Sequence, residues 1–199
     1  MDQKTCRLVL EDGTIATGCS FGAESMTPVF GEVVFNTAMS GYQEALTDPS
    51  YAGQILIMTA PEIGNYGVNH EDVESAKPQV AAFVVKEVSR VVSNHRADND
   101  LGDWLKSAHI PAMDGVDTRA LVRKIRKEGA LRGLITTDTS LTDQKLVSLS
   151  SKGLQMAGQD LASTATCDAV STWSEDLGEW NTHETEFAQK WKVVSIDCG

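Results

Sequence analysis

The chain has 199 residues and a formal net charge of −11, with 41% hydrophobic and 23% charged residues. This composition is typical of a soluble globular protein with one ordinary domain and an appendage, and no window approaches the ~20 apolar residues of a membrane span. The negative charge argues against binding to nucleic acid or to an anionic membrane surface, which both need a positive field. The polar start Met1–Lys4 lacks a signal-peptide pattern, so we expect a cytoplasmic protein.

The first half of the chain predicts antiparallel β-structure. An Asp12-Gly13 turn separates the apolar runs Cys6–Leu10 and Ile15–Cys19, which is the strongest short-range signal of a hairpin. A third β-prone run follows at Glu32–Asn36.

The stretch Gly31–Asn69 has the most unusual local sequence and is where we expect a ligand. A further β-prone run, Ile55–Met58, lies between two turn-rich segments, Asp48–Tyr51 and Pro61–Gly67. Turns at strand ends can present main-chain N–H and C=O groups to a ligand. Met39–Leu46 is too short for periodicity to distinguish a helix from a loop.

Ser50 is the candidate ligand contact in this stretch. It occupies the third position of a type I turn, Asp48-Pro49-Ser50-Tyr51, where its hydroxyl can donate or accept a hydrogen bond. A turn or capping serine is the commoner alternative. No neighbouring histidine or acid forms a nucleophile motif with it.

The middle of the chain predicts a buried strand and a short helix. Val80–Val88 is nearly continuous in apolar residues, which suits a strand covered on both faces at the sheet centre. Asn99 or Asp100 then caps a helix that carries Leu101 and Leu105 on one side, and residues 110–113 resume an extended path.

The following segment has clear helix signals at both ends. Asp117 caps a helix over Thr118–Glu128, and Gly129 ends it. Leu131–Thr136 predicts a last strand, after which Thr139 or Ser140 opens a third helix that stops near Gly153.

The helix Thr118–Glu128 carries a basic stripe in an acidic protein, formed by Arg119, Arg123, Arg126 and Lys127. One interpretation is a docking face for an acidic partner. The other is a solvated helix face whose later cations favour the helix C-terminus.

The cysteines and histidines predict no metal site. Neither group has metal-ligand spacing, and we expect the four cysteines, Cys6, Cys19, Cys167 and Cys198, to be reduced thiols. Cys198 lacks the glycine-flanked elbow of an activated nucleophile, so the sequence predicts no catalytic residue in this chain.

The last part of the chain changes character after Gly153. Residues 153–189 contain no lysine or arginine while acids accumulate, which predicts an acidic linker over 154–190. Lys192–Ile196 then predicts the first strand of an α/β domain. We therefore expect an α+β domain over 1–153, a linker over 154–190, and the start of a truncated domain over 191–199.

Several motifs occur in one order: LVLEDGT, GEVVFNTAMSGYQEALTDPSY, PEIGNYG, GVDTRALVRKIR and VVSIDCG. With them the chain closely resembles the small subunit of glutamine-hydrolysing carbamoyl-phosphate synthetase. The resemblance implies a family-specific N-terminal β/β/α domain with a mixed sheet and helices, followed by a class I glutamine amidotransferase domain.

In that family a cysteine, a histidine and a carboxylate release ammonia from glutamine, and the large subunit uses it with bicarbonate and ATP to make carbamoyl phosphate. The resemblance implies that Ser50 contacts L-glutamine, that the partner is the large subunit, and that ATP and a divalent metal bind there. The family's nucleophile and histidine would lie beyond Gly199, so this chain alone should be inactive. The alternative is a free-standing binding or scaffold module without catalysis.

Overall fold

The computed structural model describes residues 4–153, 158–167, 169–174 and 191–197. The chain forms two compact units, Met1–Gln159 and Asp160–Gly199, which are described separately. Cys198 and most of the acidic residues of the predicted linker lie outside the described residues.

The first unit is built on a closed barrel whose strands follow the order β1-β2-β6-β5-β4-β3-β7. The strands are β1 Thr5–Leu10, β2 Ile15–Ser20, β3 Val29–Asn36, β4 Ile55–Met58, β5 Ala82–Val84, β6 Ala112–Asp114 and β7 Leu131–Thr136. From β3 through β4 and β5 to β6 neighbouring strands are parallel, and the remaining pairs are antiparallel. The mixed sheet is therefore confirmed, and the sequence did not indicate that it closes.

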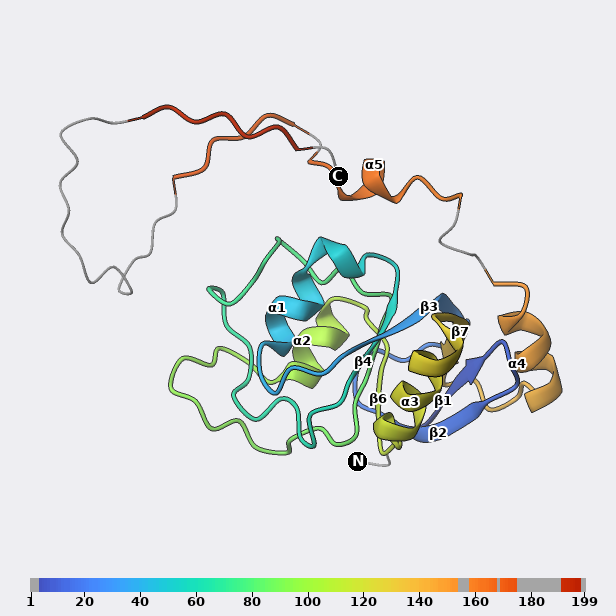
Figure 1. The fold of residues 1–199 in the computed structure, drawn as a ribbon. Coiled ribbons are helices and arrows are strands. Elements are labelled where there is room, and N and C mark those ends of the chain that lie inside the picture. Colours follow the sequence, from blue (N-terminus) through green and yellow to red (C-terminus); the bar gives the residue numbers. More distant parts are fainter. Residues whose placement is uncertain (1–3, 154–157, 168, 175–190, 198–199) are drawn as a thin grey trace. The chain divides into compact units, whose positions relative to one another are not determined.

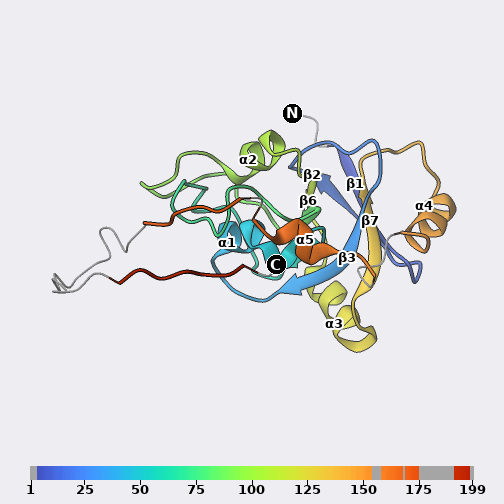
Figure 2. The same ribbon diagram turned by 90° about the horizontal axis from the view of Figure 1, so that it is seen from above.

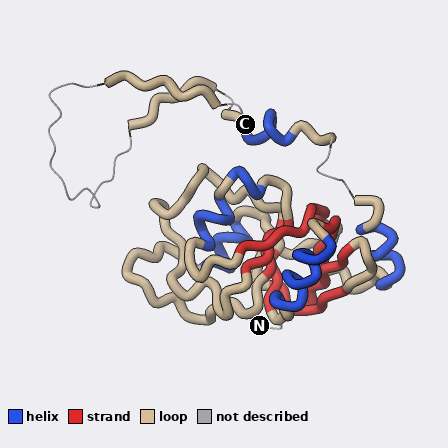
Figure 3. Tube along the Cα trace, viewed as in Figure 1, coloured by secondary structure: helices blue, strands red, loops and turns tan. Residues whose placement is uncertain are grey.

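Helices surround this barrel in the first unit (Figures 1 and 3). They are α1 Tyr42–Thr47, the 3-10 turn η1 Pro49–Tyr51, α2 Leu101–Ser107, α3 Thr118–Glu128 and α4 Asp143–Ser150. Two views show α1 and α2 on one side of the barrel and α4 on the opposite side (Figures 1 and 2). Among the helices that the structure describes, none is long and apolar enough to cross a membrane.

Alternation along the strands divides the core into layers. On β4, Ile55 and Ile57 belong to a cluster that fills the barrel and includes Leu121 and Ile125 of α3. Leu56 of the same strand belongs to a second cluster beneath α1 and α2. Because both faces of β4 are covered, the strand needs apolar residues at every position, which explains its continuous apolar run.

Several elements lie where the sequence predicts them. The hairpin β1–β2 is antiparallel, with Val9 opposite Ile15. Asp100 caps α2, the extended path after it becomes β6, and α1 resolves the helix-or-loop alternative as a helix. Helix α3 begins after Asp117 and ends at Gly129, which has a φ of 91°.

Two expected boundaries are wrong. Of the strand predicted over Val80–Val88, only Ala82–Val84 forms a strand, β5. It is short because β4 pairs with it over three residues and β6 over two. It lies between two parallel neighbours and is buried, as a central strand should be.

The third helix starts at Asp143 with Thr142 as its cap, and not at Thr139 or Ser140. The Arg7 guanidinium donates to the carbonyl oxygens of Asp138 and Leu141 at 2.6 and 2.9 Å. These contacts hold the preceding segment in a turn, so the helix cannot begin there.

Two features of the second unit concern the predicted linker and the predicted last strand. A short helix, α5 Leu161–Ala165, lies in the predicted linker, and the Asp160 carboxylate caps it by accepting from the Ser163 N–H at 3.1 Å. Residues 191–197 contain no assigned strand, and Val193, Val194 and Ile196 are more than 80% exposed. A β-strand exists only through hydrogen bonds to a neighbour, and within the described residues this segment has no paired strand.

Candidate functional site

The stretch Gly31–Asn69 forms a strand–helix–strand unit in which α1 and η1 connect the parallel strands β3 and β4. Strand β3 closely approaches the backbone just before β4 at Gly31, where a Cβ atom would lie 2.7 Å from the Gly53 carbonyl oxygen. Only glycine fits there, because real Cβ atoms do not come so close to backbone oxygen.

A tyrosine pair fixes the start of α1. Gly41 precedes the helix with φ 80° and ψ 33°, a left-handed conformation that glycine adopts without strain. The Tyr66 hydroxyl accepts hydrogen bonds from the N–H groups of Gly41 and Tyr42 at 2.7 and 3.1 Å. The two tyrosine rings stack with centroids 4.1 Å apart, and the Tyr42 hydroxyl donates to the Gly67 carbonyl oxygen at 2.5 Å. The turn-rich segment Pro61–Gly67, which contains Tyr66, therefore caps helix α1.

Burial raises the pKa of both Tyr42 and Tyr66, although the hydrogen bonds to the neighbouring backbone act in the opposite direction. Both hydroxyls consequently stay protonated near neutral pH. Each can serve as a donor and an acceptor in this network at the same time.

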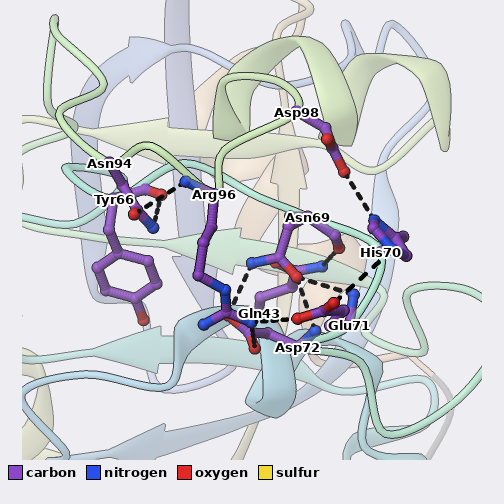
Figure 4. Close-up of polar contacts among 9 residues, drawn as sticks. All are labelled: Gln43, Tyr66, Asn69, His70, Glu71, Asp72, Asn94, Arg96 and Asp98. Carbon is purple, nitrogen blue, oxygen red and sulfur yellow. Dashed lines mark hydrogen bonds and ion pairs between the residues drawn. The ribbon is translucent and has the colours of Figure 1, made fainter. Parts of the chain in front are cut away.

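A polar network extends the same contact (Figure 4). The buried Gln43 side chain donates to the Asn69 carbonyl oxygen at 2.5 Å and accepts from the Asn69 N–H at 2.9 Å. The Asn69 side chain in turn donates to Asp72 and accepts from the N–H groups of Glu71 and Asp72. Arg96 forms ion pairs with Glu71 and Asp72 at 2.6 and 3.0 Å. These contacts hold α1 rigidly against the loop that follows β4.

Ser50 lies on η1, at the end of this rigid unit that leads into β4. The Asp48 carboxylate accepts from the Ser50 N–H at 2.8 Å, and the Tyr51 N–H donates to the Asp48 carbonyl oxygen at 3.0 Å, so the predicted turn is confirmed. Ser50 itself is exposed. Within the described part of the chain its hydroxyl has no hydrogen-bond partner, so it is available to a ligand.

A second feature is a groove of about 990 Å³ beyond the carboxyl ends of β3, β4, β5 and β6. Ser50 does not line it; η1 precedes β4 at the amino end of that strand. The residues that line the groove are Phe35, Thr37, Thr59, Pro61, Lys86, Gly115, Val116, Asp117, Thr118, Arg119, Val122, Arg123 and Arg126. Three of the four predicted stripe cations, Arg119, Arg123 and Arg126, therefore face one cavity.

The sequence did not identify Gln43, Tyr66 or Asn69 as a cluster. Their partners are 24 to 26 residues away along the chain, and no local pattern links them. The signal that was present is the polar Gln43 inside an apolar helix, because buried amides are almost always hydrogen-bonded. Within the described residues, no three His, Cys, Asp or Glu side chains converge as metal ligands would.

These features define an α+β domain with a closed mixed barrel and a rigid strand–helix–strand unit that presents the exposed Ser50. Residues 8–135 match the family model of the carbamoyl-phosphate synthase small chain, CPSase domain, and the chain belongs to this family.

Relatives in the same family come from distant organisms. The chain is 46% identical over 194 residues to the carbamoyl phosphate synthase small chain of Rhodopirellula baltica, covering 98% of this chain and 49% of the relative. It is 51% identical over 168 residues to that of Solidesulfovibrio magneticus, covering 84% and 44%. It is 45% identical to the chloroplastic small chain of Oryza sativa subsp. japonica, covering 97% and 43%. The chain thus spans about half the length of these curated relatives.

Proposed function

We propose that this chain is the N-terminal part of the small subunit of a glutamine-hydrolysing carbamoyl-phosphate synthetase. The complete subunit would release ammonia from glutamine and pass it to a large subunit that makes carbamoyl phosphate from bicarbonate and ATP. ATP and a divalent metal would bind to that large subunit. The complex would be cytoplasmic, and its product would supply pyrimidine and arginine synthesis. The family match over residues 8–135 is the observation that carries this proposal.

Within this proposal, residues 1–153 form the family-specific domain, 154–190 a linker and 191–199 the first strand of the glutaminase domain. The exposed apolar residues Val193, Val194 and Ile196 support the last assignment, since strand pairing in a further domain would bury them.

The chain alone should not hydrolyse glutamine. A cysteine nucleophile needs a lowered pKa or an adjacent base. Burial is the largest influence on Cys6 and raises the pKa of its thiol to about 12. Cys167 is exposed, and its backbone N–H donates to the Asp197 carboxylate.

The role proposed for Ser50 is to contact the bound glutamine. Its support is threefold: the turn is fixed by Asp48, the hydroxyl is exposed, and the tyrosine pair with the Gln43 network holds the preceding helix. A turn whose backbone is held in place in this way loses little backbone entropy when the side chain that it carries binds a ligand.

The test uses the full-length small subunit with its large subunit. Ser50→Ala should lower kcat/KM for glutamine about 5- to 30-fold, which corresponds to the loss of about one to two kcal/mol of hydrogen bonding. Ammonia-dependent synthesis should stay unchanged, because ammonia bypasses the glutamine site. Ser148→Ala, at an exposed position on α4, is the matched control and should change neither activity. Equal loss of both activities in Ser50→Ala would refute the assignment.

A further inference from the structure

The basic groove is a second site with its own chemistry. In parallel β-structure, loops at the carboxyl ends of the strands gather side chains from distant parts of the chain into one cavity. Here Phe35 lies near the carboxyl end of β3, Pro61 follows β4 and Lys86 follows β5, while residues of α3 also line the groove. The chemistry of this groove does not depend on whether Ser50 binds glutamine.

The charges of the groove are not neutralised within the described residues. Arg119, Arg123 and Arg126 are exposed and are spaced by four and three residues on one face of α3. Within the described residues, neither these three arginines nor the exposed Lys86 takes part in an ion pair. By contrast, Lys124 on another face of α3 pairs with Asp12 at 2.6 Å.

Among the described residues, the one acid that lines the groove already has a structural role. The Asp117 carboxylate accepts from the Ala120 N–H at 2.9 Å and caps α3. The groove therefore has an excess of positive charge in a protein whose net charge is −11. A concentrated positive field in an otherwise negative molecule selects anionic groups at that one place.

The shape of the groove indicates which anion fits. Residues four apart on a helix are ~6 Å apart along the axis, close to the ~7 Å between alternate side chains of an extended chain. The three arginines span ~10 Å of α3, which is longer than a single phosphate. The opposite wall contains apolar surface from Phe35 and Pro61.

We propose that this groove binds an extended acidic segment of a partner protein. Carboxylates at alternate positions of the segment pair with Arg119, Arg123 and Arg126, and the intervening apolar side chains contact the wall formed by Phe35 and Pro61. Because the barrel is closed, the partner cannot add a strand to a free sheet edge, and side-chain contacts must supply the recognition.

The test measures binding of a fluorescein-labelled peptide with four Glu-Leu repeats to the 199-residue chain by fluorescence anisotropy. Arg119→Glu/Arg123→Glu should weaken binding at least tenfold. The matched control, Lys145→Glu/Lys152→Glu, makes the same change in net charge at exposed positions in and after α4 and should weaken binding less than threefold. Arg119→Gln/Arg123→Gln provides a milder variant, and thermal unfolding checks that each variant is folded.

Two results would overturn the proposal. One is binding that does not depend on the specific charges. This would be seen if a peptide with glutamine in place of glutamate bound as tightly as the Glu-Leu peptide, or if the two charge-reversal pairs weakened binding equally. The other is tighter binding of ATP or of a ten-residue oligothymidylate that is lost in the groove variants, which would make the groove a phosphate site.

Discussion

Replacement of Tyr66 by phenylalanine tests the structural basis of the candidate site. The change removes one oxygen and keeps the ring that stacks on Tyr42 at 4.1 Å. The lost hydroxyl accepts from the N–H groups of Gly41 and Tyr42, which otherwise have no partner at the start of α1. We expect a less stable domain with an unchanged fold.

The magnitude follows from the number of donors that lose their acceptor. A buried donor without a partner costs about 1–3 kcal/mol, and Tyr42 is buried while Gly41 is half-buried, so the sum is about 2–3 kcal/mol. For a domain of this size, that corresponds to a fall in Tm of roughly 5–10 °C. Urea unfolding followed by circular dichroism measures the free energy, and hydrogen exchange should show faster exchange at the amides of Gly41 and Tyr42.

Tyr51→Phe is the matched control. Its hydroxyl accepts one hydrogen bond, from the Asn36 side chain at 3.2 Å, and no backbone N–H depends on it. We expect a loss below about 1 kcal/mol. If both variants unfold at the same urea concentration, or if exchange at Gly41 does not change, the Tyr66 hydroxyl is not the cap of α1 and the reasoning is wrong.

Three further predictions concern other parts of the barrel domain. Asp117→Ala should destabilise the domain by about 1 kcal/mol in urea unfolding, because the Ala120 N–H loses its acceptor, whereas Asp117→Ser should restore most of it. Burial opposes ionisation of Glu11, but hydrogen bonds from Arg132 outweigh it and hold the pKa of Glu11 below its ordinary value. The contribution of the Glu11 carboxylate to the free energy of unfolding is therefore complete above the ordinary pKa and is lost as pH falls through the lowered pKa. The stability difference between the wild type and Glu11→Gln should therefore shrink between about pH 5 and about pH 3, and a constant difference would contradict this. With its pKa raised to about 12 by burial, Cys6 should react with iodoacetamide at pH 8 on the order of 1000-fold more slowly in the folded than in the unfolded protein, as measured by peptide mass spectrometry.

The elements that could be predicted are those whose signals are local. The Asp12-Gly13 turn between apolar runs defines the β1–β2 hairpin, and Asp117 and Gly129 define both ends of α3. In each case the residues that make the deciding hydrogen bonds lie within a few positions of one another. Propensity and tertiary structure then favour the same conformation.

The elements that could not be predicted depend on distant partners. Helix α4 starts late because Arg7, more than 130 residues earlier, binds the carbonyls of Asp138 and Leu141. Barrel closure requires β1 to pair with β7, whose register joins Val9 to Leu134. No local pattern contains either contact, since loop closure over such separations is decided by the whole fold.

The candidate site divides in the same way. The turn that carries Ser50 was predictable because Asp48 caps it locally. The Tyr66 cap was not, because a tyrosine hydroxyl 24 residues away satisfies the helix start. The sequence also predicted the arginine stripe of α3 but not its opposite wall, which comes from the ends of separate strands.

The two sites share one stretch of sequence but rest on different parts of the core. Helix α1, before Ser50, packs through Tyr42 and Leu46 on the cluster outside β4, whereas α3 packs through Leu121 and Ile125 on the cluster inside the barrel. The backbone of β4 separates these clusters, and Ser50 is not among the residues that line the groove. Substitutions in the arginine face of α3 can therefore change what the groove binds without moving Ser50. The glutamine contact and the docking groove can accordingly be altered one at a time.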